Sequence, residues 1–315
     1  MAYNYGKLEL RREAAMLKAL HIGVGLFFPS YAPSGAMKLN GAEHIVSILG
    51  FCDDTTTAGA AEGTTEGAPT DQHSPSNVSP STAFKSFVTI RGPVIALEYL
   101  ELGDLSSLIS KLDAKQHVNI PNRILWSFFL CLIRAVIGMA YPIGAEIGSP
   151  TVLEEIGNNS ATAIAHQDIH GKNLMFTTNN DFAEHGLGIT LKVIDFGLAQ
   201  DLGQFDPGDH DRKANAGWMA NLWDISTQMI ETIYFPQGNE ALQTKRLCPD
   251  LLNLLLGCLH DDEKQRPRLQ GVFVTAYNAV LTKTAASFPD PASETDEAIE
   301  AFLQQYFFDA MSSTS

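Results

Sequence analysis

Apolar side chains recur at helical spacing in four stretches of the chain. Residues 8–20 carry leucine and alanine on one side and charged residues around them, which is the pattern of an amphipathic helix. Residues 108–112 and 251–259 show shorter apolar patterns of the same kind. The run 124–141 is almost wholly apolar, and Arg134 in its middle favours a buried helix over a membrane span. We therefore expect helices in these four stretches and no membrane partner.

The end of the chain predicts one more helix, within a tail of residues 284–315. Ser293 and Asp296 suit an N-cap and the acidic residue that follows it in the first turn. Apolar residues then recur at Ile299, Phe302, Leu303, Tyr306 and Phe307. We expect this helix to pack on the body of the protein or on a partner.

Strand patterns and loop compositions divide the first half of the chain. Residues 87–90 and 93–97 predict an antiparallel pair of strands around Arg-Gly, and residues 44–50 predict another strand. The segment of about 53–86 is rich in Thr, Gly, Ala, Ser and Pro, a composition typical of a disordered insertion. Residues 144–160 predict a loop insertion.

Charge and cysteine usage narrow the possible partners. The formal net charge is −15 and the pI is near 4.9, which argues against nucleic acid because such binding needs clustered Lys and Arg. The cysteines are scattered, with no metal or redox spacing: Cys52, Cys131, Cys248 and Cys258. The first residues lack a basic segment followed by an apolar one, so no secretion signal is indicated. We expect a cytoplasmic protein with reduced thiols.

Two short runs, residues 165–174 and 191–197, carry the candidate chemistry. In the first, Asp168 and Asn173 stand five apart with a glycine between them, a spacing suited to a tight loop. In the second, an apolar run ends at Asp195, followed by Phe-Gly. Polar and glycine-rich residues between the runs predict a hairpin that brings Asn173 and Asp195 together. Because Mg²⁺ prefers hard oxygen ligands, the pair predicts a magnesium site.

Together the two runs resemble the H-x-D-x-x-x-x-N catalytic loop and the D-F-G magnesium loop of the protein-kinase-like superfamily. The resemblance implies an α+β, bilobal protein-kinase-like fold with a small β-rich lobe and a larger, mainly helical lobe. Residues 1–102 would form an atypical small lobe that contains the insertion. Residues 103–283 would form the large lobe, and the tail would follow.

The same resemblance implies a reaction and a role for each residue. ATP would donate its γ-phosphate to a Ser or Thr hydroxyl of a protein substrate. Asp168 would accept the proton of that hydroxyl, while Asn173 and Asp195 would hold Mg²⁺. Lys172 would neutralise charge on the transferring phosphoryl group.

Residues 94–105 resemble the hinge that binds the nucleotide in this superfamily. Backbone groups at Glu98 and Leu100 would bond the adenine edge, and Asp104 would face the ribose hydroxyls. An N-cap role for Asp104, before a helix that begins at Leu105, fits the sequence equally well.

The phosphate-binding lysine has two possible registers. In one, residues 8–20 resemble the regulatory helix of the small lobe, with Glu13 as its glutamate and Lys7 as the nearest preceding lysine. In the other, residues 22–27 are a glycine-rich phosphate loop and Lys38 lies in a strand that resembles V-A-I-K.

Several departures from the superfamily pattern leave the function open. His170 stands where most serine/threonine kinases carry lysine, and H-x-D-x-H-x-x-N is typical of aminoglycoside and choline kinases. Residues 198–223 contain no Ser, Thr or Tyr, so activation by phosphorylation there is excluded. Asp224 is expected to bond the catalytic-loop backbone, and Arg266 lacks its family Glu partner. Beside a protein kinase, the alternatives are a pseudokinase scaffold and a small-molecule kinase.

Overall fold

The structure, a computed structural model, describes residues 41–52, 94–115, 118–145, 149–179, 181–204, 210–234 and 246–309. Glu13, Lys7 and Lys38 lie outside the described residues, as do residues 53–86. The described chain combines helices with a few short strands and is therefore an α+β protein.

The helix α4, Asn122–Ala140, forms the centre of the hydrophobic core. Nearly all of its side chains are buried, including Trp126, Phe128 and Phe129. In the described part of the chain it is also the one helix long and apolar enough to cross a membrane, but 94% of that apolar window is buried inside the protein. The helix is apolar on every side because other elements cover every side.

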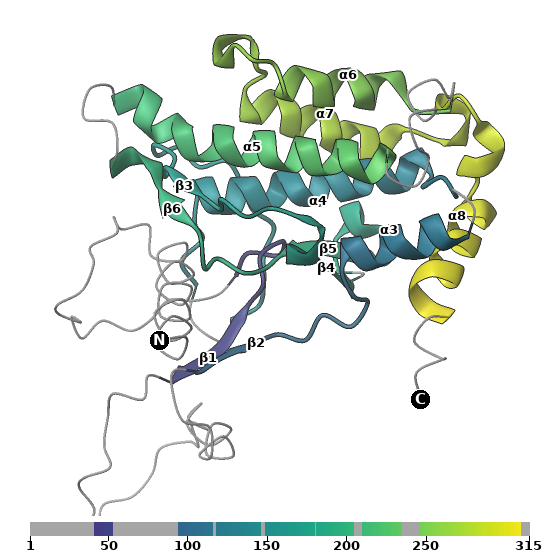
Figure 1. The fold of residues 1–315 in the computed structure, drawn as a ribbon, viewed down its shortest axis with the longest axis horizontal. Coiled ribbons are helices and arrows are strands. Elements are labelled where there is room, and N and C mark those ends of the chain that lie inside the picture. Colours follow the sequence, from purple (N-terminus) through teal and green to yellow (C-terminus); the bar gives the residue numbers. More distant parts are fainter. Residues whose placement is uncertain are drawn as a thin grey trace, which may run out of the picture.

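Other helices pack along α4 and build the body of the molecule (Figure 1). The long helix α5, His210–Tyr234, runs beside α4, and α7, Leu269–Thr282, packs against it as well. Next to α5 lies α6, Pro249–Cys258. The shorter α3, Leu105–Ala114, contacts the 3₁₀ turn Gly171–Asn173, which follows Asp168. These bounds confirm the helices predicted at 108–112, 124–141 and 251–259.

Three two-stranded sheets complete the regular structure of the described ranges. β4, Leu174–Thr178, pairs antiparallel with β5, Ile189–Val193, which confirms the predicted hairpin. β3, Ile164–Ala165, pairs with β6, Gln200–Asp201.

The third sheet differs in part from the prediction. β2, Val94–Leu97, pairs antiparallel with β1, Ile48–Cys52, far upstream in the chain. Its predicted partner, residues 87–90, lies outside the described residues. The strand predicted to begin at His44 begins at Ile48 instead, because residues 44–46 bond along β5 in a parallel bridge.

Single-turn helices fill the connections between these elements. The 3₁₀ turns are Gly171–Asn173, Ala183–His185, Leu202–Gln204, Glu263–Gln265, Ala285–Ser287 and Pro291–Glu294. The predicted loop insertion at 144–160 holds no helix or strand in its described part.

The tail helix α8, Asp296–Leu303, packs on the body, followed by a π turn, Gln304–Phe308. Phe307 meets the ring of Phe176 on β4, with 5.0 Å between ring centroids. The predicted cap was wrong by two residues: Thr295, not Ser293, accepts the hydrogen bond at the start of the helix. Ser293 is a residue of the preceding 3₁₀ turn, Pro291–Glu294, so it lies inside that turn and not at the start of α8.

A buried carboxylate in the tail caps the central helix. Glu294 accepts hydrogen bonds from the backbone N–H groups of Asn122, at 2.6 Å, and Arg123, at 3.0 Å. The first N–H groups of a helix have no partner within the helix and attract negative charge. The tail therefore stabilises the start of α4 as well as burying its own apolar face.

Candidate functional site

The β4–β5 hairpin brings the two predicted runs together. Leu174 lies opposite Val193 at the open end of the hairpin, so the residues just outside it are neighbours. The N–H of Ile194 donates to the C=O of Asn173 at 2.9 Å. Asn173 and Asp195 therefore flank the same end of one sheet, as the sequence predicted.

Asn173 is also bonded to Asp168 across the tight loop. Its amide Nδ2 donates to the backbone oxygen of Asp168 at 3.0 Å and to its carboxylate Oδ2 at 3.2 Å. Asn173 is buried and Asp168 is half-buried. Because the amide nitrogen faces Asp168, the amide oxygen of Asn173 is directed away from that carboxylate.

Two residues near the site have strained backbones. Gln167 has φ of 65° and Asp195 has φ of 61°, and they are the non-glycine residues with positive φ in the described ranges. Such a conformation costs about 1–3 kcal/mol and persists at functional sites, where the surrounding structure imposes it. One strained residue precedes Asp168 and the other is Asp195 itself, so the strain falls on both predicted runs.

His166 connects the Asp168 loop, residues 165–173, to the segment that follows β5. Its ring nitrogen Nε2 lies 3.0 Å from the C=O of Ile194, and its ring lies against Phe196 with 4.7 Å between centroids. Burial lowers the pKa of His166, while the Ile194 carbonyl and the nearby Asp168 and Asp195 oppose that change. The neutral ring thus ties the loop to the segment that carries Asp195.

The residue that holds the loop backbone was predicted wrongly. Asn221 on α5, not Asp224, accepts from the N–H of His166 at 2.8 Å and donates to the C=O of Ile164 at 2.9 Å. Asp224 lies one helical turn away, where burial raises its pKa to about 6. The missed signal was the spacing Asn-x-Trp, in which Asn221 precedes Trp223 as the acid does in the superfamily pattern.

A close glycine contact seats the Asp168 loop against α3. A Cβ atom on Gly171 would lie 2.5 Å from Oγ of Ser106 and 3.0 Å from its backbone nitrogen. A side chain there would push the loop away from the helix. Next to this contact, Asp104 caps α3 by accepting from the N–H of Ser107 at 2.9 Å, which confirms its N-cap role.

Lys172, His170 and Gln167 are the exposed residues of the loop. Nε2 of His170 lies 3.6 Å from Oδ1 of Asp168, and its Nδ1 accepts from the N–H of Lys172. The loop thus presents one carboxylate beside an imidazole and an ammonium group. Asp195 is exposed, with Oδ1 accepting from the N–H of Gly197 at 3.1 Å.

Asn173 and Asp195 offer oxygen atoms of the kind that the predicted cation binds. The carboxylate of Asp195 is accessible, and the amide oxygen of Asn173 points away from Asp168. Oxygen ligands of this kind, one or two from protein, are the usual protein contribution to a magnesium site.

The predicted hinge residues occupy the link between β2 and α3. The N–H of Glu98 donates to the C=O of Ser47 at 3.0 Å, so this N–H group is not free to bond an adenine ring. Its carboxylate accepts from the buried Lys192, at 3.1 Å, and from the N–H of Ser47. Leu100 is buried, and Tyr99 between them is 84% exposed. The side chain of Glu98 therefore has a structural role.

Arg266 finds a partner that the sequence did not reveal. Its guanidinium lies over the ring of Trp223, 4.6 Å from the centroid, and its Nε donates to the C=O of His260. A cation over an aromatic face is attracted by the ring quadrupole. The stacking and the hydrogen bond together hold the Arg266 side chain in place.

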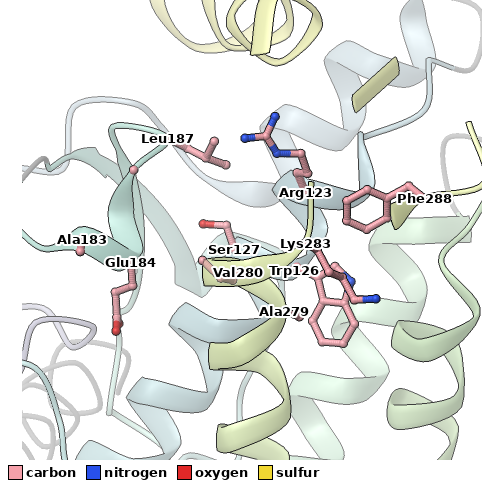
Figure 2. Close-up of a pocket in the computed structure, with 11 residues that line it drawn as sticks. Arg123, Trp126, Ser127, Ala183, Glu184, Leu187, Ala279, Val280, Lys283 and Phe288 are labelled. Carbon is pink, nitrogen blue, oxygen red and sulfur yellow. The ribbon is translucent and has the colours of Figure 1, made fainter. Parts of the chain in front are cut away.

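A small pocket of about 140 Å³ lies elsewhere, between α4 and α7 (Figure 2). Arg123, Trp126 and Lys283 line it, together with Phe288 and the turn around Glu184. Arg123 and Lys283 are paired with acidic residues of the tail and of α6. The pocket belongs to the packing of the body and is separate from the Asp168 loop.

A buried polar cluster, absent from the sequence predictions, lies under the β4–β5 hairpin. His44 bonds Glu154 through Nδ1 at 2.8 Å, and its Nε2 lies 3.0 Å from Nε2 of His185. Burial alone would lower the pKa of His44, but the Glu154 carboxylate and nearby Cys131 raise it to about 10. Burial and the neighbouring His44 lower the pKa of His185 to about 3.

An ion pair adjoins this cluster. Arg134 on α4 donates from Nε to Glu184 at 2.9 Å and from a terminal nitrogen at 2.5 Å. It also donates to the backbone oxygen of Glu154. Arg134, the charged residue of the apolar run 124–141, thus has both an ion-pair partner and hydrogen-bond partners, as a buried cation requires.

The chain matches no protein-family model, and no curated protein shows significant similarity to it.

Proposed function

We propose that this chain is an ATP- and Mg²⁺-dependent phosphotransferase with a bilobal protein-kinase-like fold, acting on a serine or threonine hydroxyl of a protein. The observation that carries the proposal is the convergence of Asp168, Asn173 and Asp195 at one end of the β4–β5 hairpin. Backbone strain at Gln167 and Asp195 supports it, since a purely structural loop has no need of both outliers.

Each residue has a role that follows from its position. Asp168, half-buried and oriented by Asn173, would position the acceptor hydroxyl and take its proton. Asn173 and Asp195 would hold Mg²⁺, which when bound neutralises charge on the phosphates of ATP. Lys172, exposed beside the loop, would add positive charge on the same side. Leu100 and Asp104 would lie along the nucleotide.

A small-molecule acceptor is the second candidate, and His170 is the observation that favours it. Its Nε2 lies 3.6 Å from the carboxylate of Asp168, so an imidazole borders the position of the acceptor hydroxyl. An acceptor with an anionic or hydroxyl group of its own would be bound by this ring. A protein kinase of the common type presents lysine at this place instead.

A pair of variants tests the assignment of roles. Asp168→Asn should reduce transfer from labelled ATP to a panel of serine and threonine peptides by roughly 10²–10⁴-fold while leaving ATP binding unchanged. Asp195→Asn should reduce both, because it removes a ligand of the cation. Asp261→Asn, at an exposed carboxylate after α6, is the matched control and should alter neither.

Three outcomes separate the alternatives. ATP binding without transfer to any peptide or small hydroxyl compound would indicate a pseudokinase scaffold. Transfer to amino-alcohol or aminoglycoside compounds, but not to peptides, would indicate a small-molecule kinase. Transfer that survives in both Asp168→Asn and Asp195→Asn would show that the site has been placed wrongly.

A further inference from the structure

Three metal-binding side chains meet in the core, away from the Asp168 loop. His44 comes from the segment before β1, Cys131 from α4 and His185 from the 3₁₀ turn between β4 and β5. Each offers one ligand atom, and these atoms lie within 4.8 Å of one another. All three side chains are buried, at 0%, 2% and 1% exposure.

The spacing of the ligand atoms suits a transition-metal ion. Nε2 of His44 and Nε2 of His185 face each other at 3.0 Å. In a tetrahedral zinc site with Zn–N bonds near 2.0–2.1 Å, two ring nitrogens stand about 3.3 Å apart. A nitrogen and a thiolate sulfur stand about 3.6 Å apart in such a site. The observed nitrogen pair is within a few tenths of an ångström of this value.

Glu154 supplies the outer support that metal-bound histidine usually has. Its Oε2 accepts from Nδ1 of His44 at 2.8 Å, which leaves Nε2 of that ring to face the other two ligands. Its Oε1 accepts from the backbone N–H of the same residue at 2.7 Å, so the carboxylate is fixed at both oxygens. A carboxylate on the second ring nitrogen orients a ligating imidazole and makes it more basic.

The charges of the cluster also balance when a divalent ion takes the place of the proton on His44 and the proton on the Cys131 thiol. With both imidazoles neutral, the thiolate of Cys131 and the carboxylate of Glu154 carry two negative charges, which equal the charge of the ion. The adjacent Arg134 is already paired with Glu184. Uncompensated charge at this depth is costly, so an equal balance favours binding.

We propose that His44, Cys131 and His185 bind a zinc ion, with Glu154 as the positioning residue of His44. Two imidazoles and one thiolate are donors that zinc prefers over magnesium or calcium. The fourth position, which no described residue fills, is left to a water molecule. The ion would join the segment before β1 to α4 and to the β4–β5 turn. The proposal is independent of the phosphotransferase function, which uses other residues.

Metal content of the full chain gives the direct test. The protein is produced with zinc in the medium, purified without a metal-affinity column and dialysed against a weak chelator. We expect about one zinc per chain in the wild type and in Cys258→Ala, and loss of it in Cys131→Ala. Cys258 is a matched control because it is also buried in the core and is outside the cluster.

A second readout starts from the wild-type protein. Replacement of zinc by Co²⁺ in the wild type should give a thiolate-to-cobalt absorption band in the near ultraviolet, and this band should be missing in Cys131→Ala. Strong chelation should lower the Tm of the wild type but not that of Cys131→Ala. A wild type that stays free of zinc and shows no cobalt band would overturn the proposal, as would unchanged zinc content in Cys131→Ala.

Discussion

Substitution of Asn221 by alanine should loosen the Asp168 loop from inside the core. The Asn221 side chain is fully buried and makes two hydrogen bonds to the loop backbone, with the N–H of His166 and the C=O of Ile164. Alanine can replace neither bond, because its side chain carries no polar atom. Both backbone groups would be left buried without a partner.

The magnitude follows from those two groups. A buried donor or acceptor left without a partner costs about 1–3 kcal/mol, so Asn221→Ala should lower the free energy of unfolding by roughly 2–6 kcal/mol. Because a domain is stable by only about 5–15 kcal/mol, this is a large fraction of the total. Asn253→Ala, at an exposed position on α6, should change stability by no more than about 0.5 kcal/mol.

Urea unfolding followed by tryptophan fluorescence measures the global effect, and hydrogen exchange of the His166 amide measures the local one. We expect the His166 amide to exchange faster in Asn221→Ala and to keep its protection in Asn253→Ala. A loss of stability below about 1 kcal/mol together with unchanged protection would refute the reasoning, because Asn221 would then not hold the loop.

Three other predictions follow from single contacts. Gly171→Ala places a methyl group against Ser106 and should reduce transfer activity. Gly271→Ala, with open space around it on α7, should instead raise stability by up to about 1 kcal/mol. Transfer assays and urea unfolding of both variants check this pair. Burial raises the pKa of Asp224 from 3.8 to about 6, so the folded state binds the proton more tightly than the unfolded state does. The free energy of unfolding should therefore fall as pH rises from 3.8 to 6. Asp224→Asn should reduce this pH dependence, as measured by urea unfolding across the same pH range. Glu294→Ala removes the carboxylate that caps α4 and should cost roughly 2–4 kcal/mol in the same assay.

The elements that the sequence predicted well depend on short-range patterns. The Asp168 loop and the β4–β5 hairpin lie within one continuous segment, where spacing and turn residues already restrict the chain. The run 124–141 is long and apolar enough that its helix and its burial were evident. The N-cap at Asp104 was likewise local, since it required only the residues of the following turn.

What the sequence did not predict depends on contacts between distant residues. His44 and His185 stand 141 positions apart, and only the fold brings them to 3.0 Å. The cysteine spacing gave no metal pattern, because the histidine partners of Cys131 come from two other elements. β2 pairs with β1 across a long intervening segment, so the nearby Arg-Gly turn was not a guide to its partner.

Asn221 shows a different kind of error, because the residue that holds the loop lies one helical turn before the predicted Asp224. Asp224 was expected to bond the catalytic-loop backbone, but the hydrogen bonds to that backbone come from Asn221. Position along the helix decides here: the two side chains lie on neighbouring sides of α5 but one turn apart along its axis, and Asn221 is at the level of the His166 and Ile164 backbone. The amide of Asn221 serves both a donor and an acceptor of the backbone, which a carboxylate cannot do.

The most direct test of the central claim is a thermal-shift titration of the purified full chain with ATP, with and without Mg²⁺. A ligand that binds only the folded state raises Tm, and at a hundred times its Kd it adds about 2.7 kcal/mol of stability. The account predicts a rise that requires Mg²⁺ and disappears in Asp195→Ala. No rise at millimolar ATP, or a rise of equal size in Asp195→Ala, would contradict it.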